Sequence, residues 1–295
     1  MDHVRLNEAS APAKFLLAGE YSVLLEGPAL AIPLPELRLS YRESAPATTE
    51  TPTRVFLNNE EIHDEGRLAK VLALRQIIAP RARASAEIHV TTRIPIGKGL
   101  GSSAALSVAM ARYHVTSPSN TQIAEIALEG EKLFHGNPSG VDPYCVSFEK
   151  PIAYVREPRS AQPLAMHDLK KSGLVFLLRD SGGEHSTRTQ LQMAMSKETL
   201  IRELASEARK MLEAVDRDAK QIAPCMHRIQ SKLSDLGASS PAIEANIAEL
   251  YSLGAQGAKI TGSGRGGFVI AVFDSGDFAK LPSTVLSRAF SWRPA

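Results

Sequence analysis

Hydrophobic and polar positions follow two different periods along this chain. Apolar residues three and four positions apart, with helix start and stop signals, predict helices at 67–78, 104–113, 120–134, 197–220, 221–236 and 241–253. Apolar runs of strand character predict β-strands at 14–25, broken by a turn at Gly19-Glu20, and at 29–34, 37–42, 86–94, 152–155, 173–178, 259–261 and 267–273. Because strands and helices mix without a strict βαβ repeat, the pattern favours an α+β fold over a doubly wound sheet.

Capping and turn residues mark the ends of several elements. Ser240 is a preferred N-cap, Pro241 suits the first helical position, and Gly254 is a typical helix stop. Pro33 and Pro35 predict a break between two short strands near the start of the chain.

The length of 295 residues exceeds that of an average domain, so we expect two lobes. Residues 156–163 are the best linker candidate. We therefore place the lobes at residues 1–160 and 161–295.

Composition narrows the choice of partners and location. Hydrophobic residues make up 43% of the chain, and the formal net charge of +2 gives no reason to expect nucleic acid or an anionic membrane as a partner. The sequence shows no signal peptide and no apolar run of membrane-spanning length. Cys145 and Cys225 lack metal-ligand spacing and are expected to be reduced thiols in a cytoplasmic protein.

The stretch Pro95-Ile-Gly-Lys-Gly-Leu-Gly-Ser-Ser-Ala-Ala105 carries the first chemical signal. Its alternating glycines lie between a predicted strand and a predicted helix, where small residues leave backbone N–H groups free to bind an anion such as phosphate. Ser102 and Ser103 add hydroxyl groups for phosphate oxygens and a metal. The spacing is that of neither a Walker A loop nor a dinucleotide-binding turn, so we expect a phosphate loop of another kind.

A second glycine cluster, Gly262-Ser-Gly-Arg-Gly-Gly267, formally fits the pattern GxGxxG. It leads into a strand, whereas the dinucleotide fingerprint must open a helix, so we reject that interpretation. A hairpin turn is the simplest alternative. The density of glycine instead suggests a backbone kept thin so that another loop or a phosphate can approach, with Arg265 either adding a charge or exposed to solvent.

Three segments in order resemble the GHMP kinase superfamily of small-molecule kinases. They are Ala13-Lys-Phe-Leu-Leu-Ala-Gly-Glu-Tyr-Ser-Val, the loop from Pro95 to Ala105, and the segment from Lys259 to Gly267. The resemblance implies a two-lobed α+β GHMP kinase fold. In that fold the N-terminal lobe is like ribosomal protein S5 domain 2, and the C-terminal lobe is a ferredoxin-like α/β sandwich. It also implies ATP and Mg²⁺ as cofactors, and a homodimer as the family's assembly.

Within the superfamily, the mevalonate kinase branch is the most similar. Glu129-Gly-Glu-Lys-Leu-Phe-His-Gly-Asn-Pro-Ser-Gly-Val-Asp142 resembles the helix and loop that carry that branch's metal-binding glutamate and catalytic aspartate. The match implies that Glu131 and Ser103 hold Mg²⁺, and that Asp142 and Lys14 are catalytic. The implied ATP- and phosphate-binding residues are Pro95, Gly97, Lys98, Gly99, Leu100, Gly101, Ser102, Ser103 and Ala104. The implied substrate-binding residues are Glu20, Tyr21, Ser186, Thr187, Gly262 and Gly264.

The residue types agree with phosphoryl transfer. An aspartate such as Asp142 can accept a proton from the attacking hydroxyl, and Lys14 can pair with it and stabilise charge on the transferred group. Taken singly, Lys14, Glu131 and Asp142 also suit surface roles: a solvated charge, a pair with Lys132 or His135, and a turn residue.

Two departures from the branch leave the acceptor open. Tyr21 stands where mevalonate kinases more often carry histidine, and a tyrosine there is more like phosphomevalonate kinases. Arg265 interrupts a run that is usually Gly or Ala. Phosphorylation of mevalonate to 5-phosphomevalonate is the leading hypothesis. The alternatives are phosphomevalonate or another hydroxylated metabolite as acceptor, with His185, Arg188 and Arg179 as candidate acceptor contacts, and a catalytically silent ligand-binding relative.

Overall fold

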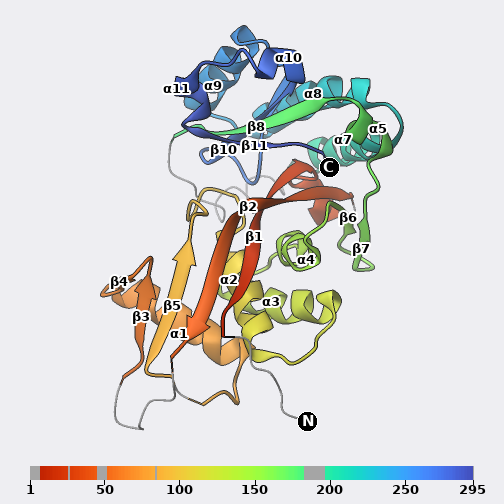
Figure 1. Ribbon diagram of the computed structural model, residues 1–295. Coiled ribbons are helices and arrows are strands. Elements are labelled where there is room, and N and C mark those ends of the chain that lie inside the picture. Colours follow the sequence, from red (N-terminus) through yellow and green to blue (C-terminus); the bar gives the residue numbers. More distant parts are fainter. Residues whose placement is uncertain (1–6, 26, 45–51, 84, 183–196, 295) are drawn as a thin grey trace. The chain divides into compact units, whose positions relative to one another are not determined.

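The computed structural model describes residues 7–25, 27–44, 52–83, 85–182 and 197–294. The chain divides into two compact units, and most of their helices and strands are labelled in Figure 1. Unit 1 comprises Met1–Lys14, Pro33–Ile96 and Gly101–Lys150, and unit 2 comprises Phe15–Ile32, Gly97–Leu100 and Pro151–Ala295. The units therefore interleave along the chain, and the family lobes expected at 1–160 and 161–295 stay a prediction.

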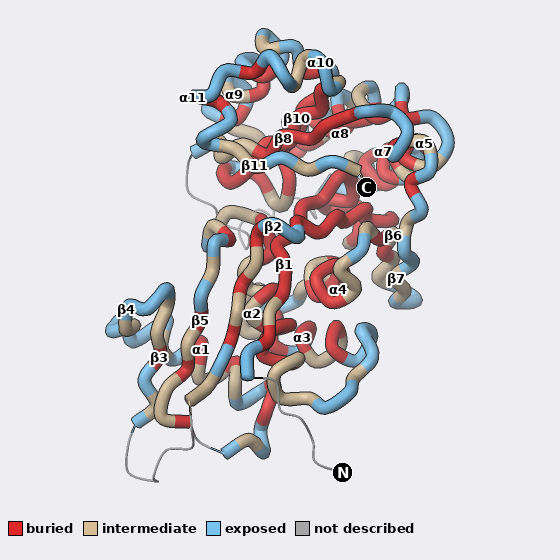
Figure 2. Tube along the Cα trace, in the orientation of Figure 1, coloured by how far each residue is buried: buried red, intermediate tan, exposed pale blue. Residues whose placement is uncertain are grey.

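A mixed sheet runs through unit 1. β2 (Ala29–Glu43) pairs antiparallel with β5 (Glu87–Thr92), and β5 pairs in parallel with β3 (Arg54–Leu57). β3 forms a hairpin with β4 (Glu60–Glu61), and β1 (Ala9–Ala18) pairs with β2. Buried positions follow β1 and much of β2 (Figure 2), so these two strands supply the apolar surface on which the unit is built.

The helices of unit 1 pack on one another. They are α1 (Glu65–Ile78), α2 (Ser102–His114), α3 (Asn120–His135) and α4 (Val141–Phe148). A capping box of Ser119 and Gln122 starts α3 where the sequence predicts a helix. α1 and α3 approach so closely that a Cβ at Gly130 would lie 2.5 Å from Leu74 Cδ1, which favours glycine at this crossing.

Unit 2 is built on an antiparallel sheet in the strand order β11-β8-β10-β9. These strands are β8 (Leu174–Asp180), β9 (Gly257–Ile260), β10 (Phe268–Asp274) and β11 (Ala289–Trp292). The ring of Phe176 lies 5.5 Å from that of Trp292, and Phe15 of β1 packs against both. The C-terminal end of β1 therefore belongs to the core of this unit.

The long helices of unit 2 cover this sheet. α7 (Glu198–Arg217) packs on α8 (Ile222–Leu236), and α8 and α9 (Pro241–Ser252) both contact β9. Ser240 caps α9 by accepting the Ile243 N–H, as predicted. Shorter helices are α5 (His167–Lys171), α10 (Ser275–Phe278) and α11 (Ser283–Leu286), with 3-10 turns η1 (Ser22–Leu25) and η2 (Ala219–Gln221). Within the described ranges, no helix has the length and apolar character needed to cross a membrane.

The predicted linker at 156–163 is wrong. β6 (Ile152–Val155) and β7 (Ser160–Pro163) form an antiparallel hairpin in which Val155 faces Ser160, so residues 156–159 are a hairpin turn. β6 also pairs with Ala29–Ala31 of β2. Because ladder hydrogen bonds fix this segment, its polar composition marks an exposed hairpin rather than a flexible connection.

The predicted break between 29–34 and 37–42 is also wrong, since β2 is a single strand from Ala29 to Glu43. Its pairing with β6 covers Ala29–Ala31, and its pairing with β5 begins at Leu39. Pro33 and Pro35 lie between these two registers, where the ladders to β5 and β6 require no N–H from them.

Candidate active site

Lys14 and Asp142 form an ion pair in unit 1. Lys14 Nζ lies 3.0 Å from Asp142 Oδ2, and the lysine side chain is 3% exposed while the aspartate is 29% exposed. β1 carries the lysine into the interior, and Asp142 lies in the first turn of α4, which follows Gly140 at a φ of 96°. The Asp142 carboxylate is therefore accessible while its lysine partner is buried. A group that accepts a proton from a bound hydroxyl needs to be accessible in this way.

Glu131 lies beside this pair on α3. Its side chain is 2% exposed, and Ser103 Oγ donates to Glu131 Oε2 at 3.3 Å. Burial, with a contribution from the negative charge of Asp142, raises the pKa of Glu131 to about 8. His135, one helical turn further on, has its Nε2 3.2 Å from Ser103 Oγ and 3.5 Å from Glu131 Oε2. Lys132, the other expected partner of Glu131, pairs with Glu129 instead.

The Glu131 carboxylate has the properties of a site for a hard cation. Its Oε1 atom is buried and makes no hydrogen bond to any of the residues that the structure describes. A carboxylate oxygen and a hydroxyl suit Mg²⁺, which binds through one or two protein oxygens, water and phosphate rather than through a closed protein cage. In keeping with this, the described residues contain no group of three or more His, Cys, Asp or Glu side chains that could hold a metal by themselves. Glu131 and Ser103 therefore fit the metal role predicted for them.

The first turn of α2 lies next to Lys14 and has the features of an anion site. α2 begins at Ser102, after Gly101 at a φ of 74°, and no side chain caps its N–H groups. A Cβ at Gly101 would lie 3.0 Å from Lys14 Cγ, so the absent side chain lets the lysine pass close to the helix start. Ser103 lies in this first turn and Ala104 is buried beneath it. The helix N-terminus and a buried ammonium group together favour a bound phosphate.

The remaining residues of the glycine loop belong to unit 2. Gly97 and Gly99 take positive φ values of 72° and 83°, and Leu100 is fully buried. Lys98 Nζ lies 3.3 Å from Asp180 Oδ2 at the end of β8, while Pro95 falls just outside this unit. The binding of phosphate by these loop residues stays a prediction.

The second glycine cluster lies against the glycine loop within unit 2. A Cβ at Gly267 would lie 2.6 Å from the Lys98 carbonyl oxygen, and one at Gly264 would lie 2.1 Å from that of Ala238. A Cβ at Gly262 would lie 3.6 Å from Gly99 Cα. The expectation that the glycines keep the backbone thin for another loop is confirmed. Arg265 is exposed and donates from Nε to the Gly237 carbonyl.

Glu20 and Tyr21, predicted to bind substrate, join the end of β1 to this cluster. Lys259 Nζ lies 2.5 Å from Glu20 Oε1, and both side chains are fully buried. The Tyr21 hydroxyl donates to the Ser263 carbonyl, and burial, with the charge of Glu20, raises the tyrosine pKa. The buried Glu20 carboxylate is thus the ion-pair partner of Lys259. The substrate-binding role of Glu20 and Tyr21 stays a prediction. Ser186 and Thr187, with His185 and Arg188, lie outside the described residues.

Sequence reasoning missed three contacts of this arrangement. His135 follows Glu131 by four positions on one helix face, which indicated their contact. Its contact with Ser103 of α2 was not predicted. A single lysine within the apolar strand containing Lys259 indicated a buried charge in need of a partner. The pairing of Lys98 with Asp180 joins residues far apart in the chain and left no sequence signal.

Comparisons with known proteins agree on one family. Residues 67–150 match the GHMP kinases N terminal domain, and residues 205–289 match the GHMP kinases C terminal family. Mevalonate kinase of Aeropyrum pernix is 31% identical over 315 residues, which cover 97% of this chain and 95% of that protein. Mevalonate kinase of Archaeoglobus fulgidus is 28% identical and covers 90% and 92%.

Solved structures show the same fold. The mevalonate kinase of Methanococcus jannaschii has a TM-score of 0.81 at 18% identity, with 100% of this chain and 99% of that chain covered. The L. major mevalonate kinase in complex with R-mevalonate has a TM-score of 0.76 at 19% identity, covering 99% and 97%. Streptococcus pneumoniae phosphomevalonate kinase has a TM-score of 0.72 at 16% identity, covering 97% and 99%. The α+β fold class expected from the sequence is confirmed.

Proposed function

The chain belongs to the GHMP kinase family, and on that premise we propose that it transfers the γ-phosphoryl group of ATP to the 5-hydroxyl of mevalonate. The main support for this proposal is the Lys14–Asp142 pair, which lies in the same unit as the uncapped start of α2 and the buried Glu131. The mevalonate kinases of Aeropyrum pernix and other archaea, which match over nine-tenths or more of this chain, support the choice of acceptor.

The residues of unit 1 divide the work of phosphoryl transfer. Asp142 orients the acceptor hydroxyl and accepts its proton, so that the hydroxyl oxygen bonds to the γ-phosphorus as the bond to the β-phosphate oxygen breaks and ADP leaves. Lys14 stabilises negative charge on the transferred group. The N–H groups at the start of α2 and the Ser102 hydroxyl hold phosphate oxygens.

Glu131 and Ser103 are the residues that hold Mg²⁺ in this proposal. The ion supplies positive charge that neutralises the β- and γ-phosphates. The unpartnered Glu131 Oε1 and the donor contact from Ser103 support this assignment.

Phosphomevalonate is the second candidate acceptor, favoured by Tyr21 in place of histidine. The Tyr21 hydroxyl is already bonded to the Ser263 carbonyl, and the Arg265 guanidinium donates to the Gly237 carbonyl. Tyr21 and Arg265 therefore both make hydrogen bonds within unit 2, which weakens the argument that they are there to bind a phosphorylated acceptor. A catalytically silent relative would have no need of the paired Lys14 and Asp142.

A coupled ADP-release assay with Mg²⁺–ATP tests the proposal against mevalonate, phosphomevalonate, diphosphomevalonate, homoserine and galactose. Turnover with mevalonate alone supports it. Turnover only with phosphomevalonate assigns the second function, and no turnover with any acceptor favours the ligand-binding relative. We further propose a cytoplasmic homodimer, for which sedimentation analysis of the purified chain is the direct test.

A further inference from the structure

A group of charged side chains surrounds the C-terminal end of α4, away from Asp142 at its start. Glu149 caps the helix in a left-handed conformation, with a φ of 50°. Arg38 of β2 donates to both carboxylate oxygens of Glu149, at 2.9 and 3.0 Å, and Arg112 of α2 donates to Oε1 at 2.5 Å. Burial alone would raise the pKa of Glu149, and these hydrogen bonds outweigh it and lower the pKa.

The two arginines also bond to β1 and to α4 itself. Arg112 donates to the Ser10 carbonyl at 2.8 Å and to the Ser147 carbonyl at 2.9 Å. Arg38 donates to the Ser10 hydroxyl from Nε at 3.1 Å and from a terminal nitrogen at 3.0 Å. We call Ser10, Arg38, Arg112 and Glu149 the α4 clamp. All four lie in unit 1.

The α4 clamp joins β1, β2, α2 and α4, and three of these elements, β1, α2 and α4, also carry one of the proposed active-site side chains. α2 carries Ser103 and Arg112, nine residues apart, or about 13 Å along a helix. α4 carries Asp142 and Glu149, seven residues or about 10 Å apart. β1 carries Lys14, four residues or about 13 Å from Ser10.

The three elements are thus joined at two ends. At one end they meet through the Lys14–Asp142 pair and the start of α2, and at the other through the α4 clamp. α4 packs on α2 and α3 through buried side chains, and the α4 clamp adds a polar attachment two turns from Asp142 that limits rotation and sliding of the helix. Phosphoryl transfer depends on positioning, so an error of about 1 Å at Asp142 is costly.

We propose that Arg112 and Glu149 are positioning residues that hold α4 so that Asp142 stays in register with Lys14. The inference rests on the proposed catalytic role of Asp142. Neither residue contacts the reacting atoms, so their effect is on the rate of the chemical step rather than on the binding of ATP or acceptor.

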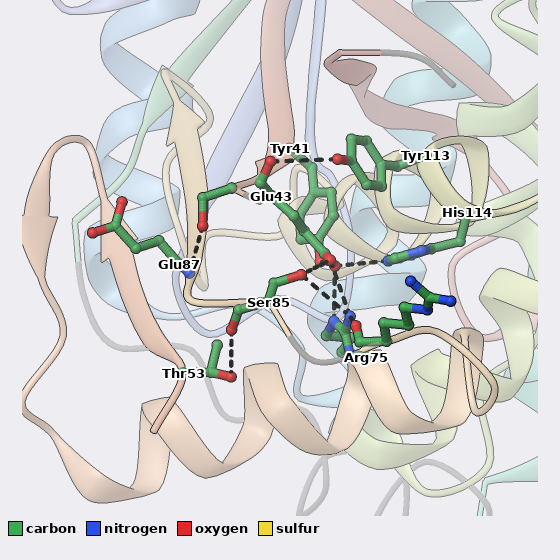
Figure 3. Close-up of polar contacts among 10 residues, drawn as sticks. Tyr41, Glu43, Thr53, Arg75, Ser85, Glu87, Tyr113 and His114 are labelled. Carbon is green, nitrogen blue, oxygen red and sulfur yellow. Dashed lines mark hydrogen bonds and ion pairs between the residues drawn. The ribbon is translucent and has the colours of Figure 1, made fainter. Parts of the chain in front are cut away.

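The test compares Arg112→Gln and Glu149→Gln with a matched control, Arg75→Gln. Arg75 donates from two nitrogens to the carboxylate of Glu43 in unit 1, at 2.8 and 3.0 Å (Figure 3). It also donates to the backbone carbonyl of Arg83. The α4 clamp variants should lower kcat roughly 10- to 100-fold and leave KM for ATP and mevalonate within about threefold. Arg75→Gln should lower thermal stability similarly while kcat stays within about threefold.

A double variant separates positioning from a general loss of structure. If the α4 clamp acts through Asp142, then Arg112→Gln added to Asp142→Asn should slow the residual reaction little further. An unchanged kcat in the two α4 clamp variants, an equal fall in the control, or full additivity with Asp142→Asn overturns the proposal. Should Arg112→Gln not fold, Arg112→Lys keeps the charge and loses the forked geometry, and an intermediate kcat is expected. Normal turnover by Asp142→Asn alone would instead refute the proposed mechanism.

Discussion

At the scale of single residues, function depends on charges in unequal environments. Asp142 is partly exposed beside a buried lysine, whereas Glu131 is almost wholly buried beside a serine hydroxyl. The same chemical group therefore suits the two roles proposed for it, as proton acceptor and as metal ligand, because its surroundings differ. Substitutions that keep shape and remove one property test each role separately.

Asp142→Asn keeps the size of the side chain and removes its ability to accept a proton. We expect kcat with mevalonate to fall by roughly 10² to 10⁴, while the affinity for ATP stays near that of the wild type. Steady-state kinetics and nucleotide binding measured by calorimetry provide the check. A variant with wild-type kcat would remove Asp142 from the mechanism.

Ser103→Ala removes the hydroxyl that contacts Glu131. The Mg²⁺ concentration giving half-maximal rate should rise about tenfold, the equivalent of about 1.4 kcal/mol for a polar contact to a charged group. Initial rates over a Mg²⁺ titration at fixed ATP measure this shift. Ser139→Ala, in the loop before α4, is a serine control that we expect to shift the titration little. An unaltered Mg²⁺ dependence in Ser103→Ala would contradict the metal assignment.

At the scale of elements, periodicity and capping gave reliable ends. α3, α9 and the strand β8 begin within about two residues of their predicted positions, the scale of ordinary boundary error. β3, β4 and β11 were not predicted, because strands of two to four residues carry too few positions to show a period. α4 was not predicted, because a helix of only eight residues shows little periodicity.

The glycine turn before β10 gives a prediction at this scale. Gly264→Ala adds a Cβ 2.1 Å from a backbone oxygen at a φ of 80°, so strain and overpacking should together lower the free energy of unfolding by on the order of 3 kcal/mol. Gly237→Ala is the matched control. Its φ is 87° and nothing lies within 4 Å of the added atom, so only the backbone cost of about 1 to 2 kcal/mol applies. Urea unfolding of both variants measures the difference, and equal losses would refute the close approach.

At the scale of the whole molecule, stability depends on buried charges that join distant segments. In unit 1, the carboxylate of Glu43 is hydrogen-bonded to four side chains, those of Arg75, Ser85, His114 and Tyr41 (Figure 3). Burial would raise the pKa of Glu43, but these hydrogen bonds outweigh it and hold the pKa well below its ordinary value. α1, α2 and β2 are thereby fixed to one another through a single charge.

This lowered pKa predicts how stability changes with pH. A carboxyl group whose folded pKa is depressed stabilises the protein above its ordinary pKa of 4.5, and that contribution is lost as the pH falls below it. Glu43→Gln should therefore lower the free energy of unfolding by roughly 3 kcal/mol at pH 7, and by progressively less below about pH 4.5. Urea unfolding at several pH values measures the difference. A gap that is constant from pH 7 to pH 3 would contradict the assignment.

The sequence alone determined the features that depend on neighbouring residues. The order of the three GHMP motifs, the glycine loop before α2 and the caps of the long helices are all local, so the α+β class and the family follow from them. Tertiary structure decided which charges meet. Residue 20 pairs with 259, and 149 with both 38 and 112, whereas the pair of Lys14 with Asp142 was already expected from the residue types and is confirmed. Such pairs leave no periodic trace, because the chain between the partners can be of almost any length. They form because folding takes charged groups at least partly out of water, and a group of opposite charge nearby is then the favourable partner.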